Sequence, residues 1–104
     1  MFWKKKPMAT QMASDSAAIV DALRPKWKMF CETMPFPDDM PLADRIEAFS
    51  APAMAGMFKH YPSTKVAPPG VLWMMIFTAV LESKTHVVAD VNAAIAQLEA
   101  RHAR

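Results

Sequence analysis

Hydrophobic side chains in this chain of 104 residues recur mainly at the spacing of buried helical faces. Positions three, four and seven residues apart share one side of a helix, whereas a half-buried strand alternates every two residues. Residues 14–34 carry such a helical stripe, and Ser14 and Asp15 could cap its start. The stripe keeps its phase across Pro25, so we expect a kink or a short break there. Its members are Ile19, Val20, Leu23, Trp27, Phe30, Cys31 and Met34.

The most hydrophobic stretch is residues 71–81, in which Thr78 is the one polar side chain. As a helix it would rise about 16 Å, roughly half of the hydrocarbon layer of a membrane, so it is too short to span a bilayer. A helix that is apolar on every side is expected to be buried on every side. We therefore predict a helix over residues 69–84 whose apolar part is the centre of a bundle, or lies between a bundle and a second subunit.

The remaining pattern predicts two further helices. One covers residues 42–60, with a break at Pro52, and the last covers residues 86–102, with Thr85 as a fair cap. No segment alternates with a period of two, so the predicted fold class is all-α, a small bundle of four main helices. The first of the two should have Leu42, Ile46 and Phe49 on its inner face, and its piece after Pro52 carries Met54, Met57, Phe58 and Tyr61. The last helix should bury Val87, Val88, Val91, Ala94, Ile95 and Leu98.

Length and composition indicate one domain that can fold without disulfides or a metal. Residues 1–13 lack helical periodicity and are predicted to form a flexible arm, which leaves 14–104 as the helical domain. Apolar residues make up 53% of the chain, slightly above the range usual for globular domains. Because a small domain has much surface to cover, this surplus favours a protein that self-associates or is covered by a partner.

The sequence predicts no catalytic, cofactor or metal site. The lone Cys31 lies on the apolar stripe, where a free cysteine behaves as a small hydrophobe. His60, His86 and His102 are far apart and lack the spacing of metal ligands. One cysteine cannot form an internal disulfide, so we expect a reducing compartment and a cytoplasmic location. An enzyme whose site is completed between subunits ranks last.

Basic residues gather in three places, although the net charge of +2 is too small to argue for a nucleic-acid partner alone. Aromatic residues lie near Lys4, Lys5 and Lys6 and near Arg24, Lys26 and Lys28. Together these cations and aromatic rings resemble the mixture found in proteins that bind single-stranded nucleic acids. Residues 2–6 could also rest weakly on an anionic membrane surface. Lys59 and Lys65 precede the apolar helix, where an anion could dock at the helix N-terminus. A solvated loop is the favoured interpretation of this segment. The groups are Lys4, Lys5 and Lys6; Arg24, Lys26 and Lys28; and Lys59 and Lys65.

We therefore expect a small, non-catalytic helical interaction or scaffold protein, either a homo-oligomer or a subunit of a larger assembly. Aromatic and methionine side chains are common at protein interfaces. The candidate contact residues are Trp27, Met57, Trp73, Met74 and Phe77. The alternative is a nucleic-acid-binding accessory protein that uses the N-terminal arm and the group Arg24, Lys26 and Lys28.

Overall fold

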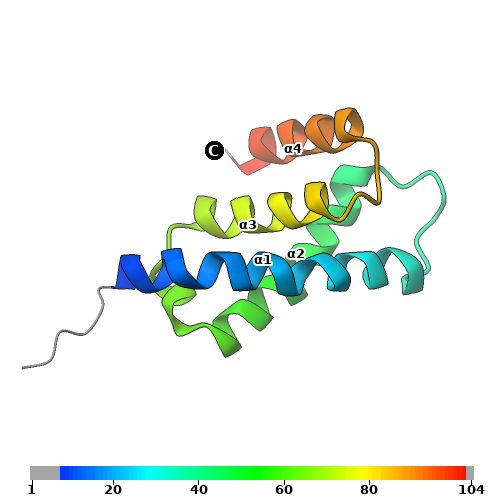
Figure 1. Ribbon diagram of the computed structural model, residues 1–104. Helices are drawn as coiled ribbons and strands as arrows, with labels where there is room; N and C mark the ends of the chain where they lie inside the picture. Colours follow the sequence, from blue (N-terminus) through cyan, green and yellow to red (C-terminus); the bar gives the residue numbers. More distant parts are fainter. Residues whose placement is uncertain (1–7, 103–104) are drawn as a thin grey trace, which may run out of the picture.

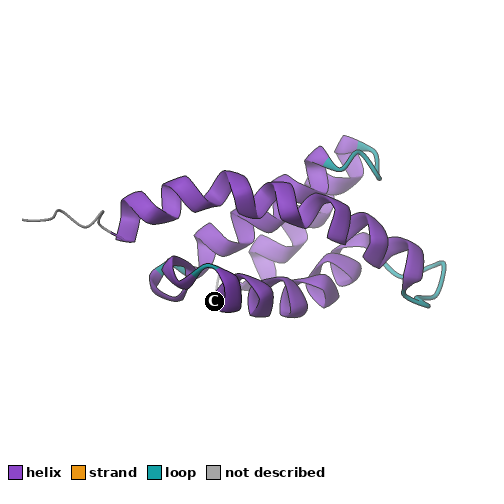
Figure 2. Cartoon of the chain, turned by 60° about the horizontal axis from the view of Figure 1, so that its bottom comes forward, coloured by secondary structure: helices purple, strands orange, loops and turns teal. Residues whose placement is uncertain are grey.

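The computed structural model describes residues 8–102, with side chains from Ser14 onward, and within them the regular elements are helical. This confirms the predicted all-α bundle. Figure 2 shows helices joined by loops near the two ends of the molecule. The elements in chain order are α1 (Met8–Thr33), α2 (Leu42–His60), the 3₁₀ helix η1 (Pro62–Val66), α3 (Pro69–Glu82) and α4 (Val88–His102).

Consecutive helices run in roughly opposite directions (Figure 1). Helices α1 and α3 form the most extensive helix pair. Helix α2 crosses behind α3 and packs chiefly on α4, while η1 packs on both α1 and α2. All four helices contribute to one apolar core. Its members are Ile19, Leu23, Trp27, Ala43, Ile46, Phe49, Ala53, Met57, Leu72, Met75, Ile76, Ala79, Val80, Val91, Ala94 and Leu98.

Trp27 is the largest fully buried side chain of the core. Its ring meets Phe49 of α2 edge-on, with centroids 5.3 Å apart, and stacks on Phe30 at 6.2 Å. Its indole Nε1 donates a hydrogen bond of 2.9 Å to Thr85 Oγ1. A buried indole needs a partner for its one polar atom, and here that partner lies in the connection between α3 and α4. Trp27 therefore joins α1 to α2 and to that connection.

Both terminal helices begin elsewhere than the pattern predicts. Helix α1 begins at Met8, ahead of Ser14, so residues 8–13 of the predicted arm are helical; residues 1–7 lie outside the described part. Helix α4 begins at Val88 rather than near Thr85. The Thr85 hydroxyl accepts the Trp27 N–H and lies 3.0 Å from Ser83 Oγ. With Thr85 held by these contacts, Val87 and Val88 are exposed, which corrects their predicted burial.

The helices continue through both internal prolines, so the predicted break at Pro52 is wrong, and α1 is unbroken at Pro25. A proline inside a helix removes one backbone donor and crowds the preceding turn. Both rings lie on exposed positions, while Phe49 and Ala53 on either side of Pro52 are buried. Most helical stability in proteins comes from packing of the apolar face, and here that packing outweighs the proline.

The segment predicted as a solvated loop, residues 59–69, is partly packed. Its beginning is the last turn of α2, and η1 buries Ser63 and Thr64. Ser63 Oγ donates to Asp15 Oδ2 of α1 at 2.8 Å, and Thr64 Oγ1 donates to the backbone oxygen of Tyr61 at 2.7 Å. Buried hydroxyls need such partners, and the bond from Ser63 fastens η1 against α1.

Replacing Trp27 by alanine should lower the free energy of unfolding by about 3–5 kcal/mol, the usual loss for a buried large aromatic. Trp73→Ala is the matched control, because Trp73 is only half-buried, and it should give a clearly smaller loss. Urea unfolding followed by circular dichroism measures both. Equal losses in the two variants would contradict the central role of Trp27.

Candidate functional site

Helix α3 is buried on one face and open on the other. Its inner positions Leu72, Met75 and Ile76 are buried, as predicted, together with Ala79 and Val80. On its outer side the Met74 side chain is 65% exposed, and Val71 is also exposed. The expectation that this helix is buried on every side is therefore wrong. In Figure 1, α3 lies between α1 and α4 with α2 behind it, so among the described residues no helix covers its front.

A groove of about 510 Å³ runs between α3 and the end of α4. Trp73 forms its centre: its ring lies 5.5 Å from that of Phe77 and 4.9 Å from that of His102. Three of the predicted contact residues thus lie together. We call the group Val71, Trp73, Met74 and Phe77 the α3 face. The groove is lined by Pro69, Gly70, Trp73, Met74, Phe77, Leu98, Glu99 and His102.

A second hollow, of about 470 Å³, lies between α1 and α3 and shares Met74 with the first. Its far end is charged: Arg24 pairs with Asp21 and, at 2.6 Å, with Glu82. These contacts, the bond to Asp21 first, raise the pKa of Arg24. Because α3 itself has no charged residue from Pro69 to Leu81, the α3 face is an uncharged strip that ends at an ion-paired cluster.

Gly70 lies in the first turn of α3 and lines the groove beside Trp73. Its backbone does not have a positive φ, and a Cβ added there would meet nothing within 4 Å. Neither backbone conformation nor packing within the chain therefore requires glycine at this position. The missing side chain leaves room for an approaching surface.

Two predicted contact residues do not belong to the surface. Trp27 and Met57 lie in the core, so they are wrong as partner contacts. The signal that places them inside was present in the pattern, since each lies on the apolar stripe of its own helix. His102, which lines the groove, was not predicted because only the folded chain brings α4 beside α3.

The structure does not join the basic residues into one patch. Arg24 is engaged with acids, whereas Lys26 lines a groove between α1 and α2. Positions two apart on a helix are separated by about 200°, so Lys26 faces away from Arg24 and Lys28. Lys59 and Lys65 are exposed on α2 and η1, and the groove at the N-terminus of α3 is lined by neither. Lys4, Lys5 and Lys6 lie outside the described residues.

Ion pairs hold the end of α4 to the start of α2. Arg101 lies 2.8 Å from Asp44 and 2.7 Å from Glu47, and hydrogen bonds to these carboxylates raise its pKa. His102 Nε2 lies 3.3 Å from Glu47. His102 thus contacts both the Trp73 ring and α2, so these contacts fix one wall of the groove.

Two side chains with chemical potential lie away from this groove. Cys31 is half-buried against the core, and burial raises the pKa of its thiol. His86 lies 6.0 Å from the Trp27 ring; burial first, and then Arg45, lower its pKa. Within residues 8–102, no three His, Cys, Asp or Glu side chains are grouped to hold a metal. None of the described helices has the length and apolar character needed to cross a bilayer.

Comparisons with protein-family models, with curated proteins and with solved structures find no match for this chain.

Acid should weaken the fold through His86. Its pKa in the folded chain lies below the ordinary 6.5, so protons bind more tightly to the unfolded chain. The contribution of neutral His86 to the free energy of unfolding is therefore fully present above pH 6.5. It is lost as the pH falls from 6.5 towards the lowered pKa of the folded chain. Urea unfolding at about pH 7.5 and about pH 5.5 should show this loss, and His86→Gln should reduce it. His60→Gln, at an exposed position, is the control; an unchanged pH dependence in His86→Gln would contradict the assignment.

Cys31 should react slowly with iodoacetamide in the native protein, because burial shields the sulfur and disfavours the reactive thiolate. Mass spectrometry should show alkylation several-fold slower than in N-acetylcysteine under the same conditions. Unfolding in urea should remove the difference. Reaction of the native protein at the rate of the free thiol would contradict an inert, structural Cys31.

Proposed function

We propose that this chain is a small, non-catalytic helical interaction protein that self-associates through the α3 face. The supporting observation is the gathering of Trp73, Met74 and Phe77 along one open, uncharged helix face. Exposed apolar patches of this kind mark interaction sites more often than chance placement does. The surplus of apolar residues in the whole chain has the same explanation, because part of it is displayed on this surface.

A second copy of the chain is the occupant that fits this face best. In a symmetric dimer the same patch meets itself, so each charge on it would face a like charge near the twofold axis. The α3 face carries none, and it is therefore compatible with itself. Met74 lies where the two hollows beside α3 meet, so its flexible side chain can adapt to an opposing helix. A cytoplasmic location, where Cys31 stays reduced, is part of the proposal.

Two methionines of equal exposure offer a matched test of self-association. Met74 is 65% exposed on the α3 face, and Met29 is 64% exposed on α1, outside the grooves described here. Met74→Lys places a positive charge on both sides of a symmetric interface and should raise the dimer dissociation constant at least tenfold. Met29→Lys should leave it unchanged. Sedimentation equilibrium of the full chain over a wide concentration range measures all three proteins.

A parent protein that stays monomeric at every concentration would exclude self-association. Equal weakening by Met74→Lys and Met29→Lys would place the contact elsewhere. Thermal unfolding of each variant shows whether its helical fold is intact before the association data are compared.

A further inference from the structure

A separate groove of about 440 Å³ runs between α1 and α2, and it shares no lining residue with the groove beside Trp73. Its floor is apolar and consists of buried side chains, namely Ile19, Leu23, Phe49, Ala53 and Met57. Its length follows α1 from Ile19 to Phe30, a rise of about 16 Å. The lining residues are Ile19, Ala22, Leu23, Lys26, Phe30, Phe49, Pro52, Ala53, Gly56, Met57, His60 and Tyr61.

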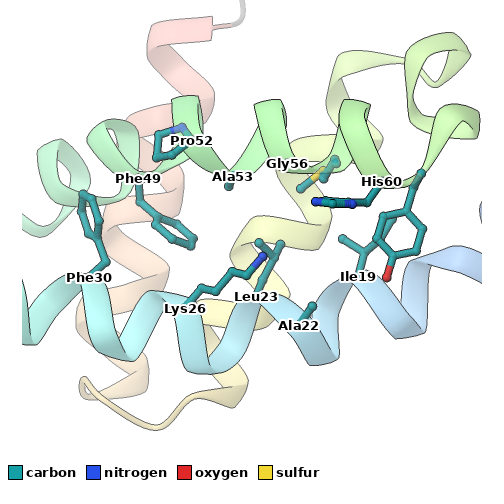
Figure 3. A pocket seen from close by; sticks show the side chains of 12 residues that line it. Ile19, Ala22, Leu23, Lys26, Phe30, Phe49, Pro52, Ala53, Gly56 and His60 are labelled. Carbon is teal, nitrogen blue, oxygen red and sulfur yellow. The ribbon is translucent and has the colours of Figure 1, made fainter.

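The polar side chains of this groove, Lys26, His60 and Tyr61, can each donate a hydrogen bond, and none of its lining residues is acidic. Figure 3 shows Lys26 of α1 and His60 of α2 directed into the space between the two helices, one from each helix. Neither forms an ion pair among the contacts of the described residues. A lysine ammonium offers three donors and a histidine ring at least one, so together they suit an anionic oxygen.

Gly56 of α2 lines the groove and has no side chain to fill it. It lies inside α2, where glycine is less favourable than alanine by about 1 kcal/mol. Its backbone does not have a positive φ, and an added Cβ would meet nothing within 4 Å. The helix therefore carries an unfavourable residue that no internal contact requires. Because Gly56 lines the groove, a side chain at this position would take up part of the groove volume.

We propose that the α1–α2 groove binds a small anionic amphiphile, a carboxylate with one unbranched acyl chain. The acyl chain would lie on the apolar floor, and the carboxylate would meet Lys26 and His60. The volume is within the range of small-molecule sites, about 300–1,000 Å³. The mixture of an apolar floor and unpaired donors distinguishes this groove from the uncharged α3 face.

Dodecanoate, used below its micelle-forming concentration, is a suitable probe for the full chain. Methyl NMR signals of Ile19 and Met57 should shift in a saturable manner with one ligand bound per chain, while those of Met74 stay in place. Dodecyltrimethylammonium has the same chain with the opposite charge and should bind at least tenfold more weakly. Equal binding of the two amphiphiles, or shifts concentrated at Met74, would overturn the proposal.

Two pairs of variants locate the site. Gly56→Leu fills the groove and should weaken dodecanoate binding at least tenfold, whereas Gly70→Leu, at the other open glycine, should leave it unchanged. Lys26→Gln should weaken it about fivefold, the scale of a partly exposed ion pair, and Lys28→Gln should not. Unfolding curves confirm that each variant folds. Undiminished binding in both Gly56→Leu and Lys26→Gln would overturn the proposal, and neither result depends on whether the α3 face self-associates.

Discussion

The burial of Trp27 is the interaction on which the rest of the structure depends. One side chain of α1 contacts Phe49 of α2 and donates its only polar hydrogen to Thr85, between α3 and α4. An indole can be buried in this way because nearly all its surface is apolar and a single hydrogen bond satisfies its nitrogen. The connection must then pass close to Trp27, and it does so with Lys84 at a φ of 56°, a conformation usually left to glycine.

Ion pairs at the C-terminal end of α4 add to the contacts between the helices. Arg101 binds two carboxylates of α2, so α4 is held on α2 rather than in front of α3. With α2 behind and α4 to one side, no helix of residues 8–102 covers the outer face of α3 (Figure 1). The open apolar face is therefore a consequence of how the other helices are anchored, and it coexists with a well-packed core on the inner side of the same helix.

The two grooves differ in chemistry although both lie between pairs of helices. The groove beside Trp73 continues into an uncharged strip, which suits another apolar protein surface. The α1–α2 groove has Lys26 and His60 directed into it, which suits a small anion with an apolar tail. Each contains one of the chain's two glycines, placed where neither backbone nor packing needs one. A protein that binds at both would use one side of its core for assembly and another for a ligand.

The sequence by itself determined the helices and their inward faces. The spacing of Ile19, Leu23 and Trp27 follows from helical geometry. The spacing of Leu72, Met75 and Ile76 does so too, because a buried stripe is a local property of the chain.

Only the tertiary structure decided which apolar residues stay outside. Met74 and Met57 are equally hydrophobic, and their different exposure depends on neighbours far away in sequence. The same holds for Pro52, where contacts from other helices stabilise a helical turn that local preference disfavours. It also holds for the grooves, because a cavity exists only once separate helices are packed side by side.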